Sequence, residues 1–176
     1  MKWRFDPPHS SVTLSAKHMM ITTVRGRVAA PTGEVDFDPE AGPASAGVRL
    51  EIDAKTIDTG DAKRDGHLRS ADFLAVADHP AITFTSTSIE RKSESSYVVT
   101  GDLTIRGTTR PVRVDVAATP VIDDGSGGKR IGIDASATID RREWGLEWNL
   151  PVPGGLLVSN EVKIEAAIEL VAQPAA

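Results

Sequence analysis

Residues 162–170, VKIEAAIEL, place an apolar side chain at every second position. Successive side chains of a β-strand point to opposite faces of the sheet, so this period of two predicts a strand with one buried face. Seven other stretches show the same alternation, two of them (24–28 and 82–89) more weakly, and eight strands are therefore predicted: 12–18, 24–28, 48–55, 82–89, 97–105, 112–118, 131–139 and 162–170.

The segments between these stretches carry turn-forming residues. Loops are predicted at Pro31–Gly33, at Asp38–Pro43, at Gly107–Pro111 and at Asp123–Gly128. Short connections between strands with a single apolar face favour antiparallel pairing. Eight such strands either close into a barrel or split into two packed sheets, which makes the chain an all-β protein.

One segment lacks the alternation. Residues 61–78 have helix-compatible spacing, and Ser70 is placed as the N-cap of a short helix that ends before Asp78. A second irregular stretch covers residues 144–151. No internal repeat or domain boundary is evident, so a single domain is predicted over residues 1–176.

The predicted strands contain few large aromatic side chains to fill the interior. Aromatic residues make up only 5% of the chain. Either the small residues of the apolar phase interdigitate with large neighbours, or they leave a hollow centre that accepts an elongated apolar guest. These small residues are Ala16, Ala54, Gly101, Ala118, Ala135, Ala137 and Ala166.

Charge and composition exclude several classes of protein. The chain of 176 residues has a net charge of −5, which argues against a nucleic-acid-binding protein. It has no cysteine, which excludes disulfides, thiolate metal sites and cysteine nucleophiles. The N-terminus shows no apolar run of a secretory signal, and no stretch is long and apolar enough for a stable membrane insertion, so a cytoplasmic location is expected.

Several motifs, in order, carry a resemblance to a known family. They include Trp3-x-Phe5-Asp6-Pro7 and Lys17-His18-Met19 near the start, and Arg142-x-Trp144-Gly145-Leu146 near the end. The most specific is Arg64–Phe73, RDGHLRSADF. With these motifs the chain resembles the YceI-like family from Trp3 to Leu170.

The resemblance implies an eight-stranded antiparallel lipocalin-like barrel, its core over about residues 3–171, with a short helical insert at about 61–78. It also implies binding of a polyisoprenoid or similar long amphipathic lipid along the barrel axis. The expected function is therefore non-enzymatic binding of a polyisoprenoid or isoprenoid quinone, with no cofactor besides that lipid. A possible homodimer and roles in lipid transport or stress response are further expectations from the family.

A prenyl tail needs a dry, continuous apolar tunnel, because burial of apolar surface supplies most of its affinity. For each proposed wall residue the alternative is plain core packing. Phe73 and Leu74, with Trp144 and Trp148, would gate or plug one end of the tunnel, or Trp144 and Trp148 would instead be an anchor that closes the barrel. The predicted ligand-binding residues are Leu14, Leu50, Ile52, Phe73, Phe84, Val99, Leu103, Val114, Ile133, Trp144, Trp148, Ile164 and Ile168.

The polar cluster in the insert has two interpretations. Arg64, His67 and Arg69 are candidates to bind a phosphate or quinone head group at the tunnel mouth, since arginine pairs well with such oxygens. The alternative, favoured for Asp58, Arg64 and Asp65, is a latch of caps and ion pairs that holds the insert on the barrel.

Catalytic and metal-binding functions find less support. Asp65 and His67 are the candidate acid–base residues of an enzyme acting on an isoprenoid lipid, but no nucleophile elbow, phosphate loop or dinucleotide motif is present. The spacing of the four histidines fits no metal-ligand motif, and His9 and His18 are expected to be buried and hydrogen-bonded. A filled structural or interaction barrel remains the third alternative.

Overall fold

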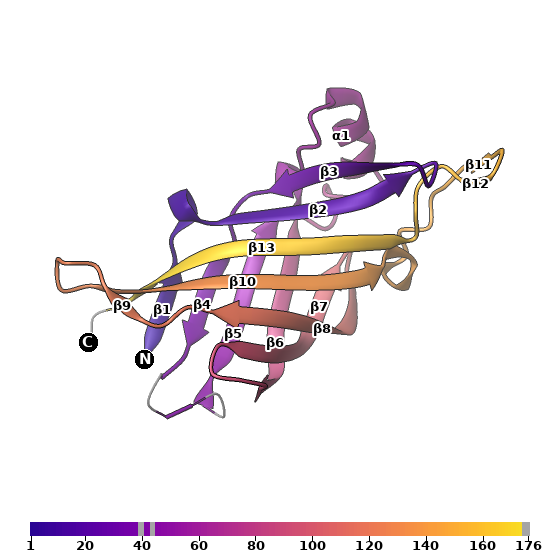
Figure 1. Cartoon of the computed structure of the whole chain (residues 1–176). Coiled ribbons are helices and arrows are strands. Elements are labelled where there is room, and N and C mark those ends of the chain that lie inside the picture. Colours follow the sequence, from indigo (N-terminus) through magenta and orange to yellow (C-terminus); the bar gives the residue numbers. More distant parts are fainter. Residues whose placement is uncertain (39–40, 43–44, 174–176) are drawn as a thin grey trace.

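The computed structural model describes residues 1–38, 41–42 and 45–173. Within these residues the chain forms antiparallel strands and one α-helix, α1, and no helix there is long and apolar enough to cross a membrane (Figure 1). The elements are β1 (Lys2–Phe5), β2 (Ser11–His18), β3 (Thr22–Val28), β4 (Thr32–Asp36), β5 (Gly47–Asp53), α1 (Ala62–Arg69), β6 (Ala81–Arg91), β7 (Ser96–Ile105), β8 (Thr108–Ala118), β9 (Ile122–Asp123), β10 (Lys129–Asp140), β11 (Pro151–Val152), β12 (Gly155–Leu156) and β13 (Glu161–Ala172).

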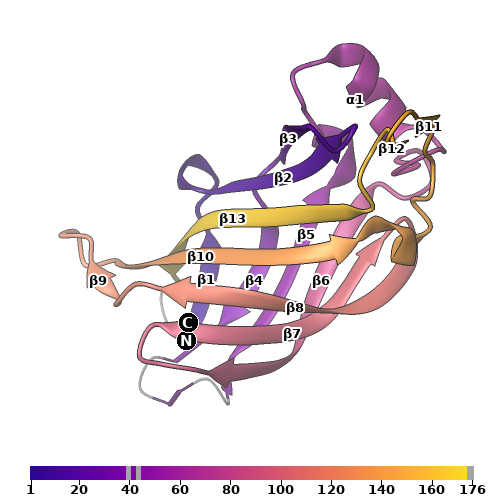
Figure 2. The ribbon, with the colours of Figure 1, turned by 45° about the vertical axis from the view of Figure 1, so that its right-hand side comes forward.

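Eight of these strands close into a ring. The order is β1-β4-β5-β6-β7-β8-β10-β13, and the ring closes because β13 pairs with β10 along one edge and with β1 along the other. All the pairings are antiparallel, and Figures 1 and 2 show the barrel from two sides. The predicted all-β fold, an eight-stranded antiparallel barrel with a short helical insert, is therefore confirmed.

The predicted set of eight strands differs from the strands of the ring. Residues 163–167 of β13 pair with β2, and residues 170–172 pair with β1, so β1 and β2 follow each other along one edge of β13. In the same way β3 pairs with β2 and β4 pairs with β1. The alternation of apolar and polar residues predicted β2 and β3. It did not predict the short strands β1 and β4, which complete the ring.

Three predicted loops are partly strands, and of the loop predicted at 123–128 only Asp123 belongs to a strand, β9. Gly33 belongs to β4, with φ +133°, and a Cβ at this position would lie 2.2 Å from the carbonyl oxygen of Arg49, so glycine here allows close strand approach. Thr108–Pro111 belongs to β8, and the turn before it is only Arg106–Gly107, both with positive φ. Pro111 is tolerated because β8 pairs with β10 only at residues 115–118, which leaves its first half an open edge. The predicted loop at 38–43 lies partly outside the described residues.

The helix of the insert begins earlier than predicted. The carboxylate of Asp61 accepts a hydrogen bond from the backbone N–H of Arg64 at 2.8 Å and caps the start of α1. Ser70 is the C-cap, because its hydroxyl and its N–H both donate to the carbonyl oxygen of His67. The assignment of Ser70 as an N-cap was wrong, and residues 71–78 form turns.

Two buried tryptophans, Trp3 and Trp144, each connect two segments of the barrel by a hydrogen bond. Trp3, fully buried on β1, donates its indole N–H to the carbonyl oxygen of Phe37 at 2.9 Å. Trp144, also buried, donates to the carbonyl oxygen of Leu103 on β7 at 3.0 Å. Each therefore combines a large buried apolar surface with a satisfied polar group.

Candidate functional site

The barrel encloses a cavity of about 690 Å³. Side chains from all eight strands of the ring line it, and nearly all of them are aliphatic or aromatic. A volume of this size lies in the range of pockets that hold small molecules.

The burial of side chains along the strands is consistent with this cavity. Along β8 and β13 most outward side chains are exposed, and most inward ones are only half-buried. Val112, Val114, Ile164 and Ile168 all face the cavity in this way. In a close-packed core such side chains would be fully buried, so their remaining accessible surface belongs to the cavity wall.

Alanines of neighbouring strands form one part of the cavity wall, named here the alanine waist. Ala135 on β10 lies directly opposite Ala166 on β13, and Val12 and Val116 flank this pair on the neighbouring strands. Of the small residues predicted to leave space, Ala118, Ala135, Ala137 and Ala166 line the cavity. The others do not: Ala16, Ala54 and Gly101 lie outside the lining, and the Phe84 ring covers Gly101.

Most of the predicted wall residues line the cavity. Trp144 and Trp148 do not, since Trp144 is buried behind the wall and Trp148 packs on the insert. The predicted residues found in the lining are Leu14, Leu50, Ile52, Phe73, Phe84, Val99, Leu103, Val114, Ile133, Ile164 and Ile168.

One end of the cavity, the mouth, is polar and exposed. This end is lined by exposed residues: Arg91 at the end of β6, Glu94 and Ser95 from the β6–β7 connection, and Thr119 and Pro120 after β8. An amphipathic molecule would enter here, because water reaches these groups while the wall beyond them is apolar.

The other end, the floor, is closed beneath the insert. Ile57, Phe73, Ile139, Arg141 and Leu146 line it, and all five are buried. In both views α1 lies at the end of the barrel away from β9 (Figures 1 and 2). The cavity is therefore a pocket with one exposed end and one dry end.

Arg141 is the charged residue of the floor, and the sequence analysis missed it. Its side chain is 5% exposed. Nε donates to the carbonyl oxygen of Ser159 at 2.9 Å, and Nη1 donates to the carbonyl oxygens of Leu146 and Trp148. Burial lowers the pKa of Arg141 from its usual value. Its structural role is to hold the 146–148 segment against the end of the barrel.

The turn that carries Arg141 depends on a carboxylate. The Arg142 guanidinium donates to Asp140 and lowers the pKa of this carboxyl from 3.8 to about 2. A depressed pKa in the folded state stabilises the fold above pH 3.8, and this stabilisation disappears as the pH falls towards 2.

Asp140→Asn is accordingly expected to lower the melting temperature at neutral pH, and the gap to the wild type should close between pH 4 and pH 2. Thermal unfolding monitored by circular dichroism across this range measures the gap. A gap of constant size down to pH 2 would contradict the assigned ion pair.

The polar residues at the start of the insert, Asp58, Arg64 and Asp65, form hydrogen bonds with other residues of the protein. Asp65, which is buried, accepts from the N–H and the hydroxyl of Thr59 at 2.9 and 2.5 Å. Arg64 donates to the hydroxyl and the carbonyl oxygen of Thr59. The backbone N–H of Gly60, followed by Arg27, lowers the pKa of Asp58. These are the contacts that the latch interpretation requires.

The three head-group candidates lie outside the cavity lining. Arg64 binds Thr59, as described, and Arg69 donates to the carbonyl oxygens of Lys55 and Ile57 at 2.7 and 2.6 Å. His67 lies 2.8 Å from Asp72, and its ring meets the rings of Phe73 and Trp148 edge-on. Asp65 and His67, considered as an acid–base pair, are thus each hydrogen-bonded to a different residue.

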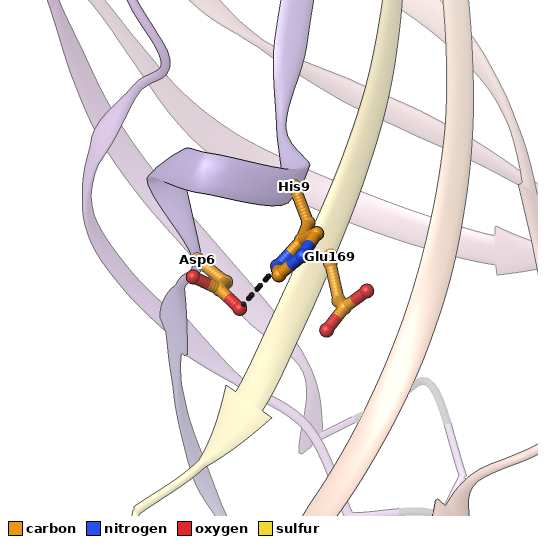
Figure 3. Close-up of side chains that lie close together, drawn as sticks. All are labelled: Asp6, His9 and Glu169. Carbon is orange, nitrogen blue, oxygen red and sulfur yellow. Dashed lines mark hydrogen bonds and ion pairs between the residues drawn. The ribbon is translucent and has the colours of Figure 1, made fainter.

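One group of side chains in the described part of the chain has the proximity of metal ligands. Asp6, His9 and Glu169 bring one ligand atom each within 4.8 Å of one another (Figure 3). Arg130, however, donates to both carboxylates, which supplies the positive charge that a metal would bring. His9 binds Asp6 and is exposed, and His18 is exposed as well, so the expectation that both are buried was wrong.

Comparison with known proteins shows which family and which relatives this chain resembles. The model of the YceI-like domain matches residues 3–170. A UPF0312 protein of Pectobacterium carotovorum is 34% identical over 174 residues, which cover 98% of this chain and 87% of that protein.

Solved structures agree with this result. BcnA of Burkholderia cenocepacia has a TM-score of 0.77 and 25% identity, with 96% of this chain and 99% of that chain covered. A polyisoprenoid binding domain from Saccharophagus degradans, implicated in plant cell wall breakdown, has a TM-score of 0.70 at 15% identity, with 97% and 98% covered. At this identity the second likeness concerns the fold alone.

Proposed function

This chain belongs to the YceI-like family, and from this premise we propose that it binds one polyisoprenoid or isoprenoid quinone inside the barrel and holds it without chemical change. The observation that carries the proposal is the apolar cavity of about 690 Å³, which runs from an exposed mouth to a dry floor.

The chemistry of the wall fits a prenyl chain. Aliphatic side chains such as Leu14, Val114 and Ile133 offer contact along the whole length and no hydrogen bonds. Burial of apolar surface contributes about 25 cal/mol per Å², so a long hydrocarbon chain gains affinity in proportion to the wall it covers. The polyisoprenoid binding domain from Saccharophagus degradans supports this choice, because its barrel has the same fold.

A non-enzymatic role is supported by the polar groups along the cavity. Apart from the mouth and Arg141, the described charged side chains lie outside the lining. Asp65 and His67, the candidate acid–base residues, are held by Thr59 and Asp72 and are not among the lining residues. Besides the mouth residues and Arg141, the lining residues with a hydroxyl group are Tyr97 and Ser136, so the wall positions a guest chiefly by apolar contact.

The direct test is to identify what the purified chain carries. Protein from two unrelated expression hosts is extracted with organic solvent, and the extract is analysed by mass spectrometry. We expect about one prenyl lipid per chain, and delipidated protein should take up squalene or a long-chain ubiquinone again. Clean extracts together with no uptake of either compound would contradict lipid binding and favour a filled or structural barrel.

A further inference from the structure

Two neighbouring turns at the floor end of the barrel carry most of the exposed large apolar side chains. One is the turn between β2 and β3, and the other is the β11–β12 hairpin with its flanks; together they are named here the apolar tips. Single exposed apolar residues are common on protein surfaces, but a contiguous group of them marks a surface that binds something. Of the seven exposed large apolar side chains in the described part of the chain, five lie on the apolar tips: Met19, Met20, Ile21, Leu150 and Leu156.

Backbone contacts hold the two tips side by side. The N–H of Met19 donates to the carbonyl oxygen of Leu157 at 2.8 Å, and His18 forms a β-bridge with Val158. The N–H of Leu157 in turn donates to the carbonyl oxygen of Leu150 at 2.9 Å. In both views the β11–β12 hairpin extends past the ends of β10 and β13 (Figures 1 and 2). The apolar tips therefore form one projecting surface.

The turn between β2 and β3 contains residues that its backbone disfavours. The N–H of Ile21 donates to the carbonyl oxygen of His18 at 3.1 Å, and Met19 and Met20 between them have φ +50° and +61°. Hairpin turns with two positive φ angles favour Asn, Asp and Gly, because larger side chains are crowded there. Ile21, which follows, is 76% exposed. Neither the turn nor the core explains three apolar residues in a row here, so their contact lies outside the chain.

The sequence around the apolar tips contains no acidic residue. Residues 7–33 and 148–160 hold neither Asp nor Glu, although the whole chain has a net charge of −5. The second range has no Lys or Arg either, whereas the first contains Lys17, Arg25 and Arg27. An anionic surface can therefore approach these two segments without repulsion from carboxylates of their own.

Two of the three cations are available to such a surface. Arg27 is bound to Asp58, whereas Lys17 and Arg25 are exposed and form no ion pair with any described residue. Lys17 Nζ donates only to the hydroxyl of Thr23, at 2.8 Å. Exposed apolar side chains flanked by cations bind the surface of anionic membranes, since apolar burial and electrostatic attraction add.

We propose that the apolar tips dock this protein on the surface of a membrane that contains anionic phospholipids. Met20, Ile21 and Leu150 enter the headgroup region, and Lys17 and Arg25 meet lipid phosphates. The tips lie outside the cavity lining, so this inference goes beyond the lipid binding proposed above. Because the floor is closed, docking holds the protein at a membrane and leaves the mouth open to water.

The charges favour a membrane over a second copy of the chain. A two-fold contact between the tips of two copies would bring Lys17 and Arg25 of both copies together, and like charges repel. A stable interface between proteins also buries about 800 Å² on each partner, which suits a broad face better than projecting turns.

Docking is measured by sedimentation of the whole chain with vesicles of phosphatidylcholine, alone or mixed with phosphatidylglycerol. We expect binding to the mixed vesicles that weakens as salt is added. Ile21→Asp should weaken it by about 10-fold or more, because a carboxylate replaces an apolar side chain in the contact. The matched control is Ile122→Asp on β9, at the far end of the barrel, where the isoleucine is 58% exposed; it should bind like the wild type (Figure 1).

The electrostatic part is tested by removing the two cations. Lys17→Gln combined with Arg25→Gln should lower the affinity for the mixed vesicles by about 10-fold and abolish the preference for phosphatidylglycerol. Arg4→Gln combined with Lys129→Gln changes the net charge equally, at exposed residues of β1 and β10. This control should keep the preference. Equal effects of the two double variants would show that net charge, and not the surface of the tips, governs binding, which would overturn the proposal.

The inserted residues are identified with a dye on a single cysteine, since the chain contains no other. Met20→Cys and Ile122→Cys are labelled with nitrobenzoxadiazole, whose emission shifts to the blue in apolar surroundings. The mixed vesicles should shift the emission of the first variant and leave that of the second unchanged. A blue shift of the Met20→Cys label without vesicles, growing with protein concentration, would identify a second copy as the occupant and overturn the proposal.

The remaining outcomes separate this inference from the proposed function. Failure of the wild type to sediment with either kind of vesicle, or equal losses in Ile21→Asp and Ile122→Asp, would overturn docking. The vesicles contain no prenyl lipid, so these results leave lipid binding in the cavity in place. Docking by a chain that neither carries nor takes up a prenyl lipid would support the inference and refute the proposed function alone. Circular dichroism checks the fold of each variant, and if Ile21→Asp does not fold, the labelled proteins decide.

Discussion

Replacement of Ala135 and Ala166 by phenylalanine should abolish binding of prenyl lipids while the barrel stays folded. The two alanines are neighbours on the paired strands β10 and β13 in the alanine waist, and both line the cavity. Two phenylalanine rings there would occupy the space through which the chain passes from mouth to floor. We expect affinity for squalene to fall by about 100-fold or more, because the chain loses contact with half of the wall.

The stability of this double variant should change little. Overpacking usually costs about 1–3 kcal/mol, but here the added rings enter a space that is already empty. The matched control is Ala167→Phe, next to Ala166 on β13 but exposed on the outer face. Lipid extraction and thermal unfolding of the three proteins provide the comparison. Full retention of lipid by the folded double variant would show that the guest lies elsewhere.

The fold could be predicted because its strands repeat one simple pattern. A one-sided strand such as β13 shows its buried face in every second residue, and eight such stretches leave few architectures open. β1 and β4 were missed because they are four and five residues long and carry too few alternating positions. Ser70 was misplaced because serine and aspartate are about equally favoured as N-caps, so the residue type alone did not decide between Ser70 and Asp61.

The wall of the cavity was predictable in part, and the reason lies in the same pattern. Inward positions follow from the phase of each strand, which gave Val114, Ile133 and Ile164. Whether an inward alanine leaves space depends on its neighbours across the sheet: Ala135 meets Ala166, whereas Gly101 is covered by Phe84. This information is contained in the pairing of strands and not in any single stretch.

Arg141 shows a signal that sequence analysis can use. The apolar phase of β10 runs through Ala135, Ala137 and Ile139, and Arg141 is the next residue of this phase. A cation that continues an apolar face faces the interior and needs partners there. The prominent Arg64, His67 and Arg69 drew attention instead, although their hydrogen bonds are made within the insert and to residues 55–59 just before it.

Removal of Trp144 is expected to cause the largest loss of stability. Trp144→Ala should lower the free energy of unfolding by about 3–5 kcal/mol, the usual cost of deleting a buried large side chain. The indole is 1% exposed, packs with Phe84, Leu103 and their neighbours, and donates to the carbonyl oxygen of Leu103. Its loss would leave both a large void and a buried unpaired carbonyl.

Trp148→Ala is the matched comparison, since this tryptophan is half-buried and touches His67 and Phe73 on the insert. Urea unfolding followed by circular dichroism should give a clearly smaller loss for Trp148→Ala than for Trp144→Ala. Equal losses of unfolding free energy would mean that the contacts of Trp148 with the insert stabilise the protein as much as the buried contacts of Trp144. If Trp148 gates the floor, the rate of lipid release should show the opposite order. Trp148→Ala should then release lipid faster than the wild type. Trp144 would be an anchor outside the cavity, so Trp144→Ala should release lipid only as the protein unfolds.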